Sequence, residues 1–553
     1  MICPESPVLK NIKYDNLWEM ASKTNYTVQH YCVLCNHLYP SDPDIFQCNE
    51  NDCEGLRYKG PYSSQMKANR QPRCYFIIAD IGAQLKNILE RKGVWSLIEK
   101  SKLHTRSNQQ QNKIADITDG EFYRKLSQPG QFLFGENNIS TIFNTDGVPL
   151  YTSTGVKLWP VFLAINELPP GHRFSRDNMI LAGIWQGKNA PPFREYMNAI
   201  GVEIGNLYNN GLVVDPHDEK GQKNVKVAII LGSMDLQAKA YVMNMTMHNG
   251  ESGCITCKEK GLVVKQGKGH ARCYPYRPPG QREDMRTTEG LICAAAVATR
   301  SNRVDGICGQ NGLALYPELD LVTGLVPDYM HGVLLGVTKN LMYKWFSATQ
   351  SKQPFFVGKR IKEISKRLQH IQPPDYIERL PRDLEKHYNH FKATELQSWL
   401  LFYSLPCLNG ILPQQYLKHF ACLSEAIHIL LRDNMSLDDL HLAEKHLDVF
   451  YRDFENLYGR GSCGLNVHNI GYHLVYYVRQ WGPLFGWSCF GFEDWNASLL
   501  QSVHGSGDVT RQLLVKKDAQ AQINAVDCGN WSNLQSQFFF RTLQNKGKAW
   551  KSL

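Results

Sequence analysis

Residues 466–500 read NVHNIGYHLVYYVRQWGPLFGWSCFGFEDWNASLL and carry two incomplete sites, whose remaining parts must come from elsewhere in the chain. His468 and His473 lie five residues apart among apolar residues, so near the start of a helix both imidazoles can reach one point. Two imidazoles supply half of the ligands of a tetrahedral metal ion. The sequence therefore predicts a second pair of ligands outside this stretch.

A single carboxylate follows in the same stretch. Trp-Gly-Pro at 481–483 ends the first helix, and Glu493 lies on a second predicted helix between Phe492 and Trp495. A carboxylate among aromatic residues favours a catalytic or buried role over a solvated one. Its partners must also lie upstream.

The composition is that of a large globular protein. The chain has 553 residues, enough for two to four domains, and 43% of them are hydrophobic. Lys and Arg outnumber Asp and Glu by 61 to 52, and the resulting charge of +9 favours an anionic partner such as nucleic acid. Without an apolar run of 18 residues or a signal peptide, the sequence predicts an intracellular protein with no membrane partner. In that compartment the 16 cysteines indicate metal ligands and core residues rather than disulfides.

Residues 1–70 form the first predicted domain, a zinc-binding module. Two close pairs of cysteines lie in a polar segment that would otherwise lack a core, and four thiolates suit the tetrahedral coordination of structural zinc. The alternatives are four free thiols, or His37 in place of one cysteine. The predicted ligands are Cys32, Cys35, Cys48 and Cys53.

The next two regions differ in their periodicity. Residues 71–138 are interpreted as a helical linker or DNA-binding region, with a helix over 76–91 and a polar linker over 101–116. Over 139–250, β-rich runs alternate with helices, which indicates the first part of an α/β core. Strands are predicted at 140–146, 157–165, 178–185 and 224–231, and helices at 191–207 and 237–245.

A long interval separates these strands from Glu493. It is too long for a loop, and amphipathic runs such as 361–368 and 416–431 predict a mostly helical insertion domain over 251–465. The last part of the core is assigned to 466–512, and a polar C-terminal tail to 513–553.

Two aspartates complete the carboxylate site. Asp146 and Asp235 each follow a predicted strand at its carboxyl end, where open α/β sheets place their sites. With Glu493 they supply the hard oxygen ligands that a two-metal phosphodiester site requires. Each aspartate also fits a helix N-cap or a turn. Asp494 and Asp328 are the nearest substitutes for a member of this triad.

Seven short motifs occur in order along the chain: Thr145-Asp146-Gly147, Gly232-x-x-Asp235, Cys254-x-x-Cys257, Asp328-Tyr-Met-His331, His468-x4-His473, Gly482-Pro483 and Phe492-Glu493. This order resembles the DDE transposases of the CACTA (En/Spm) group and the related catalytic core of the V(D)J recombinase. The likeness runs from about Cys32 to about Gly505. Each motif is short, and their ordered co-occurrence is what makes the resemblance specific.

The resemblance implies an RNase H-like catalytic core that is interrupted by the helical insertion. It implies Mg²⁺ or Mn²⁺ at Asp146, Asp235 and Glu493, and a structural zinc that ties the insertion to the core. The implied zinc ligands are Cys254, Cys257, His468 and His473.

Coordination chemistry agrees with this second zinc, because two thiolates and two imidazoles complete a tetrahedral site. A zinc close to the helix of Glu493 would also hold that carboxylate in register with the other two. His270 and Cys273 are competing ligands for the cysteine pair, since they are nearer to it in sequence.

The motif Asp328-Tyr-Met-His331 matches a D-x-x-H motif whose histidine lies near the active site in the family, so His331 is counted among the catalytic residues. Two roles stay open for it. The imidazole contacts the scissile phosphate or a flipped base, or it caps the helix that starts at Gly332.

A basic stretch in the insertion has three possible roles. It faces DNA phosphates, serves as a nuclear import signal or forms a solvated helix face. Its cations are Arg360, Lys362, Lys366 and Arg367.

The predicted function is cut-and-paste transposition: metal-dependent hydrolysis of double-stranded DNA at transposon ends, then transesterification into target DNA by the liberated 3′-hydroxyl. We expect a homodimer or higher oligomer on DNA and a nuclear location. One alternative is a domesticated, transposase-derived DNA-binding or chromatin protein without cleavage activity, and another is a structure-specific nuclease.

Overall fold

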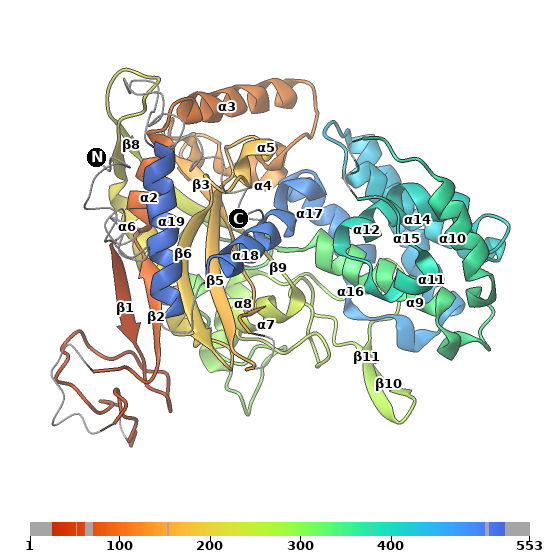
Figure 1. Ribbon diagram of the computed structural model, residues 1–553, viewed down its shortest axis with the longest axis horizontal. Helices are drawn as coiled ribbons and strands as arrows, with labels where there is room; N and C mark the ends of the chain where they lie inside the picture. The colour runs from red at the N-terminus through yellow and green to blue at the C-terminus, as the bar shows by residue number, and fades with distance from the viewer. Residues whose placement is uncertain are drawn as a thin grey trace, which may run out of the picture. The chain divides into compact units, whose positions relative to one another are not determined.

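The computed structural model describes residues 25–50, 52–60, 70–151, 154–375, 377, 379–503 and 508–525 (Figure 1). Two compact units make up the chain, each assembled from segments that are distant in sequence. The first contains Met1–Glu99, Thr145–Ala228 and Gly491–Leu553, and the second contains Lys100–Asn144 and Ile229–Phe490. None of the helices in the described ranges combines the length and the apolar content that a membrane span needs.

The first unit is built on antiparallel strands in the order β1-β2-β6-β5. All but the first residue of β5, KLWPVFLAI, is buried, so its sequence is a continuous apolar run rather than an alternating one. The strands are β1 (Tyr26–His30), β2 (Tyr75–Ala79), β5 (Lys157–Ile165) and β6 (Ile180–Gly187), with β4 (Val148–Pro149) paired to β5.

Helices pack against these strands within the first unit. α18 (Phe490–Gln501) reaches β5 through Trp495, whose ring centroid lies 5.6 Å from that of Phe162. α19 (Val509–Ala525) runs along β6 (Figure 1), so the first part of the predicted C-terminal tail is helical, and residues after 525 lie outside the described ranges. The unit also contains α2 (Ile81–Leu89), α5 (Pro170–Arg173), α6 (Phe193–Asn210), β7 (Leu212–Val214) and β8 (Lys223–Val225).

The second unit has its own strands and a hairpin. β3 (Ile139–Thr145), β9 (Val227–Met234) and β12 (Leu325–Pro327) follow one another in the sheet, and β12 runs parallel to β9. β9 leads into α7 (Leu236–Val242). The hairpin consists of β10 (Leu262–Gln266) and β11 (Gly269–Cys273).

Residues 330–481 of the second unit are mostly helical, in line with the amphipathic runs of this segment. α15 (Leu437–Tyr458) begins at a capping box of Ser436 and Asp439 and ends at Gly459, whose φ is 82°. It packs on α14 (Gln414–Leu430). The other main helices are α9 (Lys339–Phe346), α10 (Ile361–His370), α12 (Ala393–Ser398), α16 (Leu465–His468) and α17 (Leu474–Trp481).

Two predictions for residues 71–138 are wrong. The helix expected over 76–91 begins as β2 and becomes helical at Ile81, because 76–79 are buried between β1 and β6 and Asp80 caps α2. The polar linker expected over 101–116 is helical to Gln110 in α3 (Val94–Gln110).

The polar residues of α3 serve internal hydrogen bonds. Thr105 Oγ1 lies 2.6 Å from Thr118 Oγ1, and Asn108 Nδ2 donates to Asp119 Oδ2 at 2.9 Å. These groups are buried, so the polarity that indicated a linker satisfies partners inside the second unit.

Candidate metal centres

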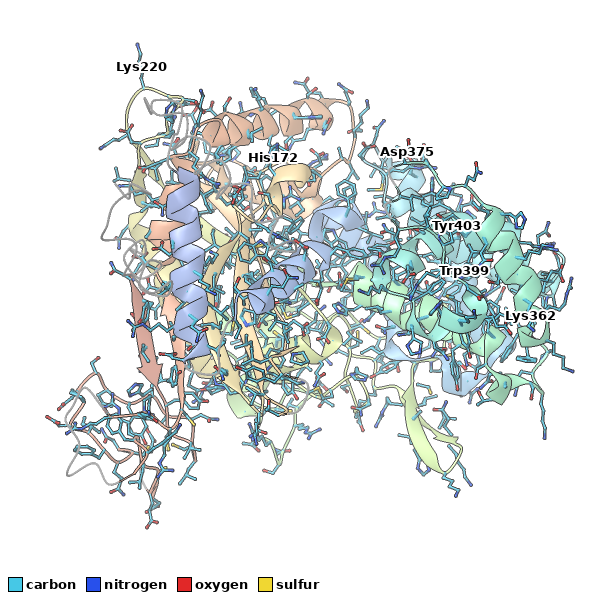
Figure 2. The ribbon with its side chains drawn as sticks, viewed as in Figure 1. His172, Lys220, Lys362, Asp375, Trp399 and Tyr403 are labelled. Carbon is cyan, nitrogen blue, oxygen red and sulfur yellow. The ribbon has the colours of Figure 1, made fainter. Side chains whose placement is uncertain are left out.

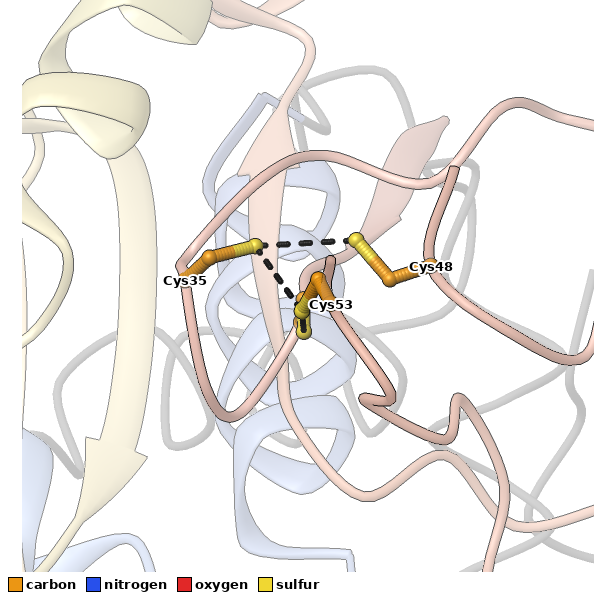
Figure 3. A group of neighbouring side chains, drawn as sticks. Cys35, Cys48 and Cys53 are labelled. Atoms are coloured by element: carbon orange, nitrogen blue, oxygen red, sulfur yellow. Dashed lines mark hydrogen bonds between the residues drawn. The ribbon is translucent and has the colours of Figure 1, made fainter. Parts of the chain in front are cut away.

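The four cysteines of the N-terminal module converge on one point. The Sγ atoms of Cys35 and Cys48 lie 3.5 Å apart, and those of Cys35 and Cys53 lie 3.6 Å apart (Figure 3). The Sγ atoms of Cys32 and Cys53 are also 3.6 Å apart. Tetrahedral zinc with Zn–S bonds of about 2.3 Å requires sulfur separations of about 3.8 Å. The group could therefore hold zinc with little movement of its thiols.

Tight turns of the backbone bring these thiols together. Asn36, with φ of 65°, closes the turn after Cys35, and the backbone N of Leu34 donates to Cys32 Sγ at 3.4 Å. Burial raises the pKa of the Cys32 thiol, but hydrogen bonds from the backbone of Cys35 and Leu34 and from the neighbouring thiols together outweigh burial and bring that pKa to about 7. His37 instead pairs with Glu50, with 2.8 Å between Nδ1 and the carboxylate, and stands outside the cysteine group.

A second group joins residues more than two hundred positions apart. Cys254 Sγ lies 3.6 Å from His473 Nε2, Cys257 Sγ lies 3.3 Å from His468 Nε2, and the two Nε2 atoms are 3.1 Å apart. All four side chains are buried in the second unit. Two thiolates and two imidazoles at these separations could also hold a tetrahedral zinc.

The pKa shifts of Cys254 and His473 favour the forms of these two side chains that bind a metal. Burial would raise the pKa of the Cys254 thiol, but Cys257 and the two imidazoles hold that pKa well below its usual range. Burial lowers the pKa of His473, which keeps its imidazole neutral. The hydrogen bond to Cys254, together with burial, raises the pKa of the Cys257 thiol, so zinc would have to displace a proton from Cys257.

A π-helical turn explains how two histidines five residues apart face one point. Residues 469–473 form a π-helix between α16 and α17. In an α-helix, positions five apart differ by about 140° around the axis, whereas i→i+5 hydrogen bonding places them on one face. The spacing predicts that the two histidines meet near the start of a helix, whereas in the structure a π-helical turn brings them together.

Further side chains orient these four residues. Arg286 is buried and donates from Nε to the backbone O atoms of Cys254 and Cys257, at 2.9 Å each. The Tyr451 hydroxyl donates to Tyr274 O at 2.5 Å and lies 3.2 Å from His468 Nδ1. Contacts of this kind fix the ligands and raise metal affinity. They stand in no recognisable motif, and sequence reasoning missed them.

The competing ligands lie elsewhere on β11. His270 is exposed, and Cys273 is buried with its thiol 3.9 Å from Ala271 O. Neither belongs to the group of four among the described residues. The geometry thus favours the long-range set over the pair that is nearer in sequence.

A buried carboxylate holds His331 at a small cavity in the second unit. Asp328 Oδ2 lies 2.7 Å from His331 Nδ1 and accepts from the His331 backbone N at 2.8 Å, while Oδ1 accepts from Cys489 N at 2.8 Å. Burial alone would raise the pKa of Asp328, but His331 and the backbone donors hold it below its usual range. The Asp328 carboxylate, and not the His331 imidazole, accepts a backbone N–H in the first turn of the π-helix that starts at Met330.

The same cavity has a lining residue beside the Cys2His2 group. Its polar lining residues are Asp235, Asp328, His331, Asn466 and Asn469. Asn469 Oδ1 lies 3.7 Å from Cys254 Sγ, so a residue of the cavity wall also contacts the zinc-ligand group. Asp328, His331 and Cys489 form a third group whose ligand atoms could hold a metal.

The predicted carboxylate triad is divided between the units. Asp146 and Glu493 belong to the first, and Asp235 belongs to the second. Asp146 Oδ1 accepts from Gly147 N at 2.7 Å, and Asp235 Oδ1 caps α7 by accepting from Ala238 N at 2.6 Å. The triad therefore stays a prediction.

Glu493 lies in the first turn of α18, on a helix that is anchored by its aromatic neighbours. Phe492 packs edge-on against Phe174, with ring centroids 5.3 Å apart, and the Trp495 ring packs at a tilt on Phe162 of β5. Of the suggested substitutes, Asp494 pairs with Arg176 at 3.2 Å and Asp328 holds His331. Both substitutes thus have cationic or imidazole partners of their own.

The basic stretch of the insertion forms local ion pairs on α10. Glu363 lies 2.8 Å from Arg360 and 2.9 Å from Arg367, and Lys362 lies 3.9 Å from Glu385. Figure 2 shows Lys362 at the outer side of the helical region, pointing away from it. These pairs favour the solvated helix face among the three roles considered.

Comparison with known families gives one match. Residues 112–277 match the family model described as Transposase family tnp2, which is less than a third of the chain. The matched segment includes Asp146, Asp235, Cys254 and Cys257. No curated protein matches the chain. The match supports a transposase family.

Proposed function

We propose that this chain is a DDE-type, cut-and-paste DNA transposase of the CACTA kind, with an RNase H-like core. The observation that carries the proposal is the tnp2 match over 112–277, because it contains Asp146 and Asp235, which the motif order had singled out. The cysteine pair and the histidine pair of the second zinc-ligand group also support the proposal, because they lie together and belong to the same ordered set of motifs.

The proposed active site consists of Asp146, Asp235 and Glu493. These carboxylates would hold two Mg²⁺ or Mn²⁺ ions, which activate a water or 3′-hydroxyl and stabilise the leaving oxygen. Carboxylate oxygens are hard ligands, which suit Mg²⁺ and Mn²⁺.

His331 has a separate part in the proposal. The Asp328 carboxylate is ionised and can only accept, so Nδ1 of His331 carries the proton between them. Nε2 then accepts a hydrogen bond from a DNA base in the neutral imidazole, or donates one to a DNA phosphate in the imidazolium.

The two proposed zinc ions have a structural role and take no part in the reaction. Zinc at Cys254, Cys257, His468 and His473 would close a loop of more than two hundred residues in the second unit, and zinc at the four N-terminal cysteines would fold that module. The expected partners are double-stranded transposon ends and target DNA, bound by a homodimer or higher oligomer in the nucleus.

Cleavage of its own flanking DNA tests this function. The full chain, loaded with zinc and supplied with Mn²⁺, is expected to nick flanking genomic DNA at terminal inverted repeats. Asp146→Asn, Asp235→Asn and Glu493→Gln should each reduce nicking at least about a hundredfold, the scale of a transition-state charge contact. Asp494→Asn is the matched control, because Asp494 is exposed and pairs with Arg176.

Two results would change the conclusion. DNA binding without nicks in any of these proteins favours the domesticated DNA-binding alternative. Full nicking activity in the three carboxylate variants removes them from the reaction and leaves the DDE assignment without support.

A further inference from the structure

The β10–β11 hairpin concentrates positive charge at the surface of the second unit. Residues 258–273 read KEKGLVVKQGKGHARC, with five Lys or Arg and one Glu, so they contribute +4 (5 − 1) of the whole chain's +9. The exposed cations among them are Lys258, Lys260, Lys265 and Lys268.

Two carboxylates beside this hairpin are paired with arginines. Glu259 is buried and lies 2.9 Å from Arg277. Glu251 lies 3.9 Å from Arg272, which is the one hairpin cation that is mostly covered. Among the described residues, no ion pair involves the four exposed lysines.

The hairpin also exposes apolar side chains. Leu262 and Val263 are 43% and 59% exposed, which is unusual for β-strand residues of a folded unit. Gly267, with φ of 59°, begins the two-residue loop between β10 and β11 and turns the chain sharply. Figure 1 shows the hairpin as a separate two-stranded ribbon beside the helices of its unit.

The base of this ribbon is fixed to the Cys2His2 group. Cys257 precedes β10, and Tyr274 directly follows β11. Tyr274 N donates to Cys463 O at 2.6 Å, Tyr274 O accepts from Tyr451, and its ring centroid lies 5.3 Å from that of His468. A ribbon with a fixed base loses little conformational entropy when its tip binds a partner.

We propose that the β10–β11 hairpin is a duplex-DNA contact, with Lys258, Lys260, Lys265 and Lys268 on the phosphates. A two-stranded ribbon fits the major groove of B-DNA, and the unpaired lysines complement the backbone charge. Leu262 and Val263 can then pack on deoxyribose. The inference rests on the proposed function, which supplies the DNA.

Charge-neutral variants of the full, zinc-loaded chain test the hairpin. Binding of a fluorescent random-sequence duplex is measured by anisotropy over a range of salt concentrations. Lys265→Gln with Lys268→Gln should weaken binding about 10- to 100-fold, and lower the slope of log affinity against log salt by about 2. Lys362→Gln with Lys366→Gln removes the same charge from α10 and should change binding less than threefold.

Unchanged zinc content and circular dichroism in the hairpin variant establish that it is folded. If it then binds DNA with the affinity and salt slope of the wild type, or if the α10 variant loses as much, the hairpin assignment is wrong while DNA binding stands. If the wild-type protein shows no salt-dependent binding to duplex DNA, the proposed function and the hairpin contact fall together.

Discussion

At the scale of single residues, Gly55 shows how closely the backbone surrounds the N-terminal cysteines. A Cβ at this position would lie 2.1 Å from Cys32 Sγ, far inside any van der Waals contact. Gly55 O also accepts from Cys48 N at 2.9 Å, so the glycine joins two of the four cysteines. The thiol could not stay at its place in the group beside a larger residue.

Gly55→Ala is therefore expected to displace Cys32 and to lower zinc content by about one ion per chain, since the site needs four ligands. Elemental analysis of the purified protein measures the loss. Gly171→Ala is the matched control, because a Cβ there meets nothing within 4 Å. Equal zinc contents in the two variants would show that Cys32 is not a ligand.

Another single residue provides a pH test that does not involve a proposed metal. His419 is buried on α14, and its Nε2 lies 2.7 Å from Phe450 O. Burial lowers its pKa from 6.5 to about 4, although the Phe450 carbonyl opposes the shift. Between these values the unfolded chain binds the proton more tightly, so protonation favours unfolding.

The free energy of unfolding should therefore fall as the pH drops from about 6.5 to about 4, with a contribution from His419 of about 3 kcal/mol. His419→Gln keeps a donor for Phe450 O and should remove this part of the slope in urea denaturation. His428→Gln, an exposed position on the same helix, should leave the slope intact. If the free energy of unfolding of His419→Gln falls with pH as steeply as that of the wild type, or more steeply, His419 is not the source of this pH dependence.

At the scale of elements, the π-helix at 469–473 is the feature that sequence spacing could only partly predict. The spacing of His468 and His473 indicated a shared target, and the cysteine pair supplied matching ligands. Helix type was not predictable, because the residues of a π-turn have no distinctive propensity and the tertiary contacts select it. The strand β2 was missed for a related reason, since four apolar residues before a capped helix continue its periodicity.

His473→Ala is expected to release about one zinc per chain and to reduce DNA cleavage strongly, although the buried imidazole contacts no substrate in this proposal. Zinc analysis and the nicking assay measure the two effects on the same sample. His270→Ala removes the competing ligand, and should keep both zinc and activity because His270 is exposed on β11. If His270→Ala lost zinc and activity while His473→Ala kept both, the zinc ligands would be those on the hairpin.

At the scale of the whole molecule, the two candidate zinc groups lie in parts of the chain that differ in the size of their hydrophobic core. The buried cluster of the N-terminal module consists of Cys32, Tyr39 and Cys48, with Ile45 and Cys53 against it. Most of that cluster is made of proposed ligands. The second unit instead has a large aromatic core around α14 and α15, so its zinc group adds a cross-link to an existing fold.

Removal of zinc with a chelator should therefore unfold the module while α14 and α15 stay folded, because only the module lacks another core. Limited proteolysis is expected to cut first within residues 32–57 and more slowly in the second unit. Protein resupplied with zinc is the control and should regain protection. Simultaneous cutting throughout the chain would show that the two zinc groups support one cooperative fold.

The wide turn at 469–473 also makes the second unit sensitive to rotation. A π-turn holds one residue more than an α-turn, so its conversion to an α-turn would rotate everything beyond it by about 100° about the helix axis and draw it in by about 1.5 Å. α17 begins at the next residue, and its end at Gly482 packs against Asp116. Zinc at His468 and His473 would thus hold this segment in the π-helical form. A one-residue deletion inside 469–473 would rotate His473 away from His468 and abolish the site.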